Sequence, residues 1–474
     1  MPKVVGPLLS LDARKSIGKT LTFQKRRGVN IVYGYKKPGD VNNFVMSEYQ
    51  YIQRNKMKDA RYNWKGFDQS IRNIYNQSVE GKNLSGYNRY LQMYMTTVHI
   101  VLRGFITEWV VSGDATARTI TLPLKNTRTE GALVYNFTVD WGDGTTPSVV
   151  NAYDSANRIH TYAQNGTYQV EITGICEGWS FYDSASAVKI TKVINWGDAP
   201  LFEGFKYLAN GFFGCTNLNS LPTGSIQARG TGIGVEGFNM TFYNCTSLTT
   251  ISANLFKNHT EVTKSAFYGT FRNCTGLTSI PADIFKYNTK ATTQGFAYTF
   301  YGCTNITSIP TDLFRFNTLV TTSAFEGTFD GCTKLVVIPV DLFRYNTEVS
   351  NAGFRRTFNS CSLLTTIPDG LFKYNTKAIT SAFAYTFQTC PKLKINPWTF
   401  YLDGEQSTRF LNQSVYFDWC FYRSSFTGQQ GNAPDLWNCN FGTGTPSKGY
   451  CFYGSGNNTS SLANYNDIPA AWKS

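Results

Sequence analysis

The sequence predicts a multi-domain α+β protein: a small module of a β-hairpin plus helices, then a β-sandwich, then a solenoid of repeats of about 29 residues. Three observations predict this order. Positive charge is concentrated in the first hundred residues, strand-like alternation follows, and cysteines then recur at a nearly constant period. The chain has 474 residues, of which 42% are hydrophobic and 16% charged, a composition typical of folded domains.

The N-terminal module is predicted from alternation and from helical periodicity. The segment 19–39 alternates as two strands about residues 26–28, which indicates a hairpin that ends at a Pro-Gly pair. Helical stretches are expected at 43–63 and 64–77, and a third helix begins near Ser85, a good N-cap residue.

Basic residues crowd the hairpin at Lys25, Arg26, Arg27, Lys36 and Lys37. Residues 1–100 contain 17 Lys+Arg and 6 Asp+Glu, whereas the remaining chain contains 27 and 25. The charge has three interpretations: a solvated surface, a dock for an acidic protein surface, or nucleic-acid binding. No nucleic-acid fold signature accompanies the charge, so we do not expect a nucleic-acid partner.

Three alternating segments, TITLPL, YNFTVDWGDGTT and HTYAQNGTYQVEITG, predict strands of a small β-sandwich separated by turns. The WGDG segment at 141–144 indicates a tight turn in which Asp143 bonds nearby amides. Asp140 and Asp143 could instead be calcium ligands, but we favour the turn. His160 is interpreted as a structural residue of the following strand.

The repeats are marked by cysteines 29 or 30 residues apart, within a frame that reads TFxxCxxLxxIP. One unit cannot bury its Phe, Cys, Leu and Ile alone, so neighbouring units are expected to stack. We expect a short strand before each proline and a single helical turn at each following LF pair. We favour buried, reduced thiols for the cysteines, with disulfides or metal ligands as the alternatives. These cysteines are Cys215, Cys245, Cys274, Cys303, Cys332, Cys361, Cys390 and Cys420.

A basic column lies beside an aromatic column after each LF pair, which predicts a surface for acidic glycans or a protein partner. Alternatively, Asp283, Asp312 and Asp341, three residues earlier, neutralise the cations, and the rings cover the repeat edge. The predicted stripe comprises Lys286, Tyr287, Arg315, Phe316, Arg344, Tyr345, Lys373 and Tyr374.

Motifs of catalysis and cofactor binding are missing from the sequence. The chain has three histidines and no HExxH, CxxC or GxxxxGK motif, so no enzyme, metal site or cofactor is expected. No apolar run approaches the roughly 18 residues of a membrane-spanning helix. The N-terminal segment is a poor secretory signal because it lacks an apolar core.

Several motifs resemble known families. The segments FYGCTNITSIPTDLF and FEGTFDGCTKLVVIPVDLF resemble BspA-type leucine-rich repeats of gut-bacterial surface proteins and their phages. DWGDGT, followed by HTY and GTYQVEI, resembles PKD-type immunoglobulin-like domains, and SIGKTLTFQKRRG with LSGYNRY resembles N-terminal domains of phage structural proteins. The implied domains are 1–104 for docking, 105–195 PKD-like, 196–400 leucine-rich repeats, and 401–474 terminal repeats and cap.

These resemblances imply a phage virion protein, made in the host cytoplasm and exposed on the particle, with other virion proteins as partners of residues 1–100. Cytoplasmic synthesis agrees with reduced cysteines and with the missing export signal. The expected role is capsid decoration with adhesion through the repeats. A tail-associated receptor-binding protein, a bacterial surface adhesin and a DNA-binding protein are the alternatives.

Overall fold

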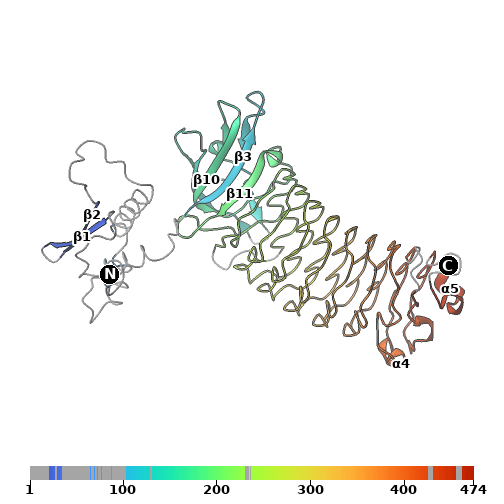
Figure 1. Ribbon diagram of the computed structural model, residues 1–474. Helices are drawn as coiled ribbons and strands as arrows, with labels where there is room; N and C mark the ends of the chain where they lie inside the picture. Colours follow the sequence, from blue (N-terminus) through green and yellow to red (C-terminus); the bar gives the residue numbers. More distant parts are fainter. Residues whose placement is uncertain are drawn as a thin grey trace. The chain divides into compact units, whose positions relative to one another are not determined.

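The computed structural model describes residues 21–26, 29–34, five single positions between 65 and 87, and 103–474 except 129–130, 230–233, 235, 425–430 and 455–461. The chain forms two compact units, Met1–Val101 and Leu102–Ser474. Figure 1 traces the second unit from a sheet-rich region into a long series of turns. Among the described residues, no helix is long and apolar enough to cross a membrane.

The first unit contains the predicted hairpin. Strand β1 (Leu21–Arg26) pairs antiparallel with β2 (Val29–Gly34), so that Arg26 lies opposite Val29. Lys65, Gln69, Arg72 and Asn76 are helical, and so is Tyr87, in agreement with the second and third predicted helices. The predicted helix at 43–63 lies outside the described residues.

The second unit begins with an antiparallel sheet of five strands in the order β11-β3-β10-β7-β8, which confirms the sheet-rich region predicted before the repeats. Two small two-stranded sheets, β4-β9 and β5-β6, accompany it. The strands are β3 (Phe105–Val111), β4 (Thr119–Thr121), β5 (Thr127–Arg128), β6 (Gly131–Ala132), β7 (Tyr135–Asp140), β8 (Ser148–Val150), β9 (Ile159–Thr161), β10 (Gly166–Cys176) and β11 (Ile190–Trp196).

The inner face of this sheet is aromatic. Alternate residues of β7 are buried, as the period of two predicts, and the buried residues of the two strands include Phe105 and Trp109 of β3 and Phe137 of β7. Trp141 is buried too, and His160 of β9 stacks on it with ring centroids 4.8 Å apart. The aromatic core therefore holds the predicted WGDG turn against β9.

That turn has the predicted architecture. Asp140 accepts a hydrogen bond from the Gly142 amide at 2.9 Å, and Asp143 accepts one from the Thr145 amide at 3.1 Å. Burial raises the pKa of Asp143, but hydrogen bonds from Thr145 and His160 more than offset it and leave the pKa lowered. Both carboxylates are thus bonded within the turn, as predicted.

The sheet continues directly into the repeats. Lys192 of β11 bridges Ser220 in parallel, and the Val193 amide donates to the Ser220 carbonyl at 3.0 Å. The buried carboxylate of Glu177 lies at the same junction, where Lys206 and Arg229 approach it at 2.8 and 3.0 Å. The edge strand β11 therefore pairs with the first repeat, and this pairing leaves fewer backbone groups of β11 without a hydrogen bond.

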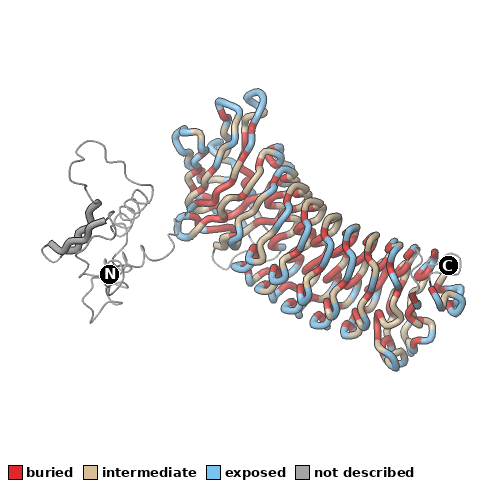
Figure 2. Tube along the Cα trace, in the orientation of Figure 1, coloured by how far each residue is buried: buried red, intermediate tan, exposed pale blue. Residues whose placement is uncertain are grey.

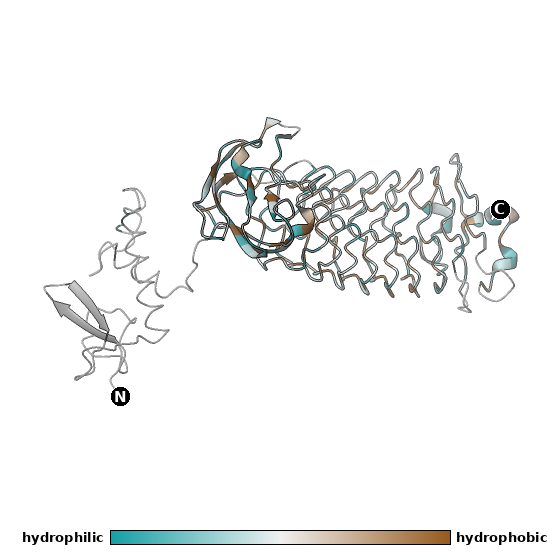
Figure 3. Cartoon of the chain, turned by 90° about the horizontal axis from the view of Figure 1, so that it is seen from above, coloured by the Kyte–Doolittle hydropathy of each residue, from teal (hydrophilic) through white to brown (hydrophobic). Residues whose placement is uncertain are grey.

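From about residue 205 the backbone consists mainly of turns whose amides donate to carbonyls 28 or 29 residues ahead. The Phe296 amide donates to Ala324, and the Phe325 amide donates to Gly353. Figure 2 shows buried and exposed residues alternating along this region, and Figure 3 shows hydrophobic and hydrophilic residues interspersed along it. Because the same bond recurs from each repeat to the next, an insertion or deletion within a repeat would break it, which explains why the sequence period is so strict.

Three columns of buried phenylalanines fill the repeats. In one column, Phe271, Phe300 and Phe329 stack at centroid distances of 5.6 and 5.8 Å, with interplanar angles of 7° and 5°. The eight periodic cysteines are buried and free, as predicted, and so are Cys176, Cys439 and Cys451. The Cys303 thiol donates to the Phe271 carbonyl at 3.0 Å, and Cys332 makes the same contact with Phe300 at 3.2 Å.

A buried polar ladder accompanies the rings. Asn346 donates from its side-chain amide to the Phe314 and Asn317 carbonyls at 3.1 and 2.9 Å. Asn288, Asn317 and Asn375 make equivalent pairs of bonds in their own repeats. His259 occupies this position in an earlier repeat, and the buried Arg409 bonds the Asn375 carbonyl at the other end.

Two local predictions differ from the structure. The strand before each proline is reduced to single bridges, such as Ser308 with Val337, because Ile-Pro follows and proline has no amide to extend the ladder. The predicted helical turn is a tighter turn, in which the Lys286 amide bonds the Asp283 carbonyl three residues back. The Asn288 amide likewise bonds the Phe285 carbonyl three residues back, and the Asn288 side chain is buried, so the chain turns inward here.

The C-terminal segment closes the last repeats. Trp472 is buried in the final helix, and its ring lies 6.0 Å from that of Phe417. The short helices of this unit are α4 (Gln406–Arg409) and α5 (Ala470–Lys473), and its 3-10 turns are η1 (Ala156–Arg158), η2 (Ala187–Lys189), η3 (Leu436–Asn438) and η4 (Tyr465–Asp467).

Candidate surface-binding site

The candidate site is the predicted stripe, which we call the cation–ring ladder: Lys286, Tyr287, Arg315, Phe316, Arg344, Tyr345, Lys373 and Tyr374. Local packing places each pair outside. In one repeat Ile284 and Phe285 are buried and Asn288 is buried, so the two residues between them project outward. The exposed fractions of Tyr287, Phe316, Tyr345 and Tyr374 are 37, 41, 38 and 38%.

Cations and rings alternate along the ladder. The Arg315 guanidinium carbon lies 5.8 Å from the Phe316 ring centroid and 5.4 Å from that of Tyr345 in the next repeat. Arg344 likewise lies 5.8 Å from Tyr345 and 5.3 Å from Tyr374. Each of these guanidinium groups therefore contacts two rings, an arrangement that sequence spacing alone did not predict.

The alternative interpretation, neutralisation by aspartate, also has structural support. In three successive repeats, ion pairs join Lys286 to Asp283 at 3.6 Å, Arg315 to Asp312 at 3.5 Å, and Arg344 to Asp341 at 3.2 Å. The hydrogen bond that Arg344 donates to Asp341 raises the pKa of Arg344. These pairs are exposed and screened by solvent, so they contribute little to stability, and they leave the rings accessible.

The predicted docking residues are placed only in part. Lys25 and Arg26 lie in strand β1, while Arg27, Lys36 and Lys37 lie outside the described residues. The hairpin that the sequence predicted to carry this charge is therefore present, and its docking role stays a prediction.

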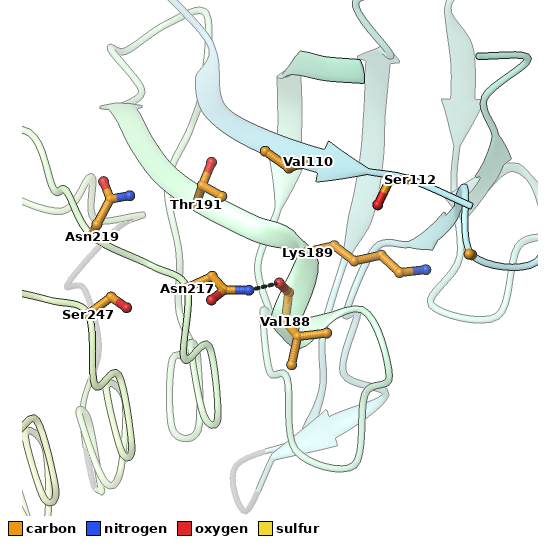
Figure 4. Close-up of a pocket in the computed structure, with 9 residues that line it drawn as sticks. Val110, Ser112, Val188, Lys189, Thr191, Asn217, Asn219 and Ser247 are labelled. Atoms are coloured by element: carbon orange, nitrogen blue, oxygen red, sulfur yellow. Dashed lines mark hydrogen bonds between the residues drawn. The ribbon is translucent and has the colours of Figure 1, made fainter. Parts of the chain in front are cut away.

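A groove that sequence reasoning missed lies between the sheet and the first repeats. Its volume is about 570 Å³. Figure 4 shows Lys189 extending along it beside Val110, with Asn217 bonded to the Val188 carbonyl at 2.6 Å. The Lys189 ammonium donates to the Thr119 carbonyl at 2.6 Å, and burial lowers its pKa. Only tertiary packing brings these segments together, so no sequence motif could have revealed the groove.

The thiols and carboxylates are poorly placed to act as nucleophiles or as metal ligands. Burial raises the pKa of Cys390 to about 12, so its thiolate is scarce at neutral pH. Among the residues that the structure describes, no group of three or more His, Cys, Asp or Glu is arranged to hold a metal ion. The surface ladder is thus the most developed candidate site of the described chain.

Comparison with protein-family models gave no match, and comparisons with curated proteins and with solved structures gave none either.

Proposed function

We propose that this chain is a non-enzymatic structural protein of a phage virion, a capsid decoration or accessory protein that displays its repeats for adhesion. In this proposal residues 1–104 dock on other virion proteins, 105–195 form a PKD-like spacer, and 196–400 form a BspA-type leucine-rich-repeat solenoid. The terminal repeats and cap occupy 401–474. The sequence resemblances described above support this assignment.

The observation that carries the adhesive role is the cation–ring ladder. It presents rings of Tyr287, Phe316 and Tyr345 at one position per repeat, each more than a third exposed. Rings and guanidinium groups are the side chains most enriched where proteins bind partners. A regular row of them suits an extended ligand with its own repeat, such as a glycan chain.

The rigidity of the array supports the same role. Stacked phenylalanine columns and the asparagine ladder hold equivalent residues in register, so the exposed rings are ordered before a ligand binds. A pre-ordered surface loses less conformational entropy on binding than a flexible one. The repeats are thus suited to display rather than to catalysis.

The docking role is tested on particles. Replacing Lys25, Arg26 and Arg27 with Glu in the full chain should abolish incorporation into particles, because an acidic partner would repel the reversed charge. Mass spectrometry of purified particles measures incorporation, and a circular dichroism spectrum equal to that of wild type is the folding control. Normal incorporation of the charge-reversed chain would refute electrostatic docking.

The alternatives are separated by location. Electron cryo-microscopy of particles would place a decoration protein on the capsid and a receptor-binding protein on the tail. A bacterial adhesin would be found on cells and not in particles. We prefer the capsid location. Finding the protein on the tail or on cells instead would contradict the decoration role.

A further inference from the structure

The last repeats carry a second group of rings, at a different position of the repeat from the cation–ring ladder. We call it the C-terminal aromatic patch: Tyr385, Trp419, Tyr422, Tyr450 and Tyr453. Trp419 lies 4.4 Å from Tyr422 and 4.8 Å from Tyr450 by ring centroids. Tyr422 stacks on Tyr453 at 5.4 Å. Tyr450 and Tyr453 are 43 and 44% exposed, so the cluster faces solvent.

The backbone beneath this patch is strained. Tyr385, Trp419 and Tyr450 have φ angles of 62°, 60° and 56°, in the left-handed region that bulky residues rarely adopt. Each lies two residues before a core phenylalanine, a position that Gly269 and Gly327 occupy in other repeats with φ of 57° and 58°. Met240 and Arg356 also hold this position, with φ of 50° and 58°, so the left-handed backbone belongs to the repeat and accepts different side chains.

The repeat itself does not need those rings. The glycine-bearing repeats keep the same left-handed backbone and the same hydrogen bonds, since the Gly327 amide donates to the Arg355 carbonyl as the Trp419 amide donates to that of Gly449. The rings at this position therefore pack mainly on one another at the surface. A group of exposed rings that the backbone itself does not require is typical of a binding surface.

A cation beside the patch indicates the charge of the ligand. Arg423 is exposed, and its guanidinium carbon lies 5.3 Å from the Tyr422 ring centroid. Within the described part of residues 103–474 it has no ion-pair partner, whereas Arg315 and Arg344 of the ladder each pair with an aspartate. A guanidinium held against a ring and without a carboxylate is suited to receive one from a ligand.

We propose that the C-terminal aromatic patch binds an acidic polysaccharide. The rings of Trp419 and Tyr450 contact the apolar C–H faces of the sugars, and Arg423 pairs with a sugar carboxylate. A glycan fits better than a protein segment because tyrosine hydroxyls beside ring faces match a sugar, which combines hydroxyls with apolar faces. The proposal deepens the adhesive part of the proposed function and rests on it only for the class of ligand.

The test uses the purified full chain and two charged probes, polygalacturonate and hyaluronate, with neutral dextran for comparison. We expect affinity electrophoresis to show retardation by at least one charged polymer and none by dextran. Trp419→Gly and Tyr450→Gly should each weaken binding at least tenfold. Because glycine relieves the left-handed strain, both variants should melt within a few degrees of wild type.

Two further variants sharpen the result. Tyr298→Gly removes a ring from the same position in an earlier repeat, where φ is 55°, and should leave binding unchanged. Arg423→Gln should abolish the preference for charged polymers. Failure of both charged probes to bind, equal retardation by dextran, or full binding by the folded Trp419→Gly and Tyr450→Gly variants would overturn the proposal. Particle incorporation plays no part in this assay, so the docking proposal can fail separately.

Discussion

Replacing His259 with asparagine should remove a specific acid sensitivity from the repeats. His259 is fully buried, its Nε2 atom lies 3.1 Å from the Ile226 carbonyl, and its ring packs edge-on against Phe238 at 5.0 Å. Burial lowers the pKa of His259 from 6.5 to about 4, with the Ile226 hydrogen bond opposing the shift. Asparagine is the residue at the equivalent position of the following repeats, at Asn288 and Asn317.

The size and sign of the effect follow from proton linkage. The unfolded chain takes up the proton near pH 6.5, but the folded chain does so only near pH 4. The unfolded state therefore binds more protons in this window, and the free energy of unfolding falls as the pH falls. Between pH 7.5 and pH 5 the loss attributable to His259 is about 2 kcal/mol, rising to about 3 kcal/mol below pH 4.

Urea unfolding at several pH values, with hydrogen exchange of residues 236–275 as a local readout, measures this loss. Wild type should lose about 2 kcal/mol more than His259→Asn between pH 7.5 and pH 5. Comparing slopes cancels any constant difference in stability between the two proteins, and it also cancels the contributions of the titratable groups that both proteins retain. Equal pH dependence of wild type and variant would refute the buried, neutral assignment of His259.

The remaining predictions concern the polar ladder, the thiols and the surface rings. Asn346→Ala should lower the free energy of unfolding by about 3 kcal/mol in urea titrations, since two buried carbonyls lose their donor; a loss below about 1 kcal/mol would contradict this. Cys332 should react with a maleimide only in denaturant, and rapid labelling of the folded chain would show that its burial is wrong. Changing Tyr287, Phe316 and Tyr345 together to Ala should reduce adsorption to host cells with little change in melting temperature; a large stability loss with unchanged adsorption would leave these rings a structural role only.

Some predictions from sequence failed for a common reason. The strands before Pro310 and Pro339 were expected to pair along their length, but only Ser308 and Val337 bridge there. The period shows which residues of neighbouring repeats are equivalent. It does not show how many backbone hydrogen bonds form between those repeats. The pairing of 21–26 with 29–34 was predicted correctly because strand alternation on both sides of a short connection is a local signal.

For the cation–ring ladder, the sequence predicted one column of basic residues beside one column of rings, and nothing more. Spacing correctly placed Arg315 beside Phe316 and outside the core, because the buried neighbours on both sides fix the direction of the pair. It could not show that Arg315 also contacts Tyr345, since that contact depends on the offset between neighbouring repeats. Nor did it reveal the patch around Trp419, whose members come from irregularly spaced terminal repeats.

By itself, the sequence determined the basic front, the alternating middle and the columns of Phe, Cys and Leu, because each shows in the charge distribution, in a period of two or in a period of 29 residues. Only the tertiary structure decided that β11 continues into the first repeat, that the groove beside Lys189 forms, and that Trp419 adopts a left-handed backbone. Those features arise where segments with unrelated local patterns meet, and their energies depend on backbone register and packing between residues far apart in the chain.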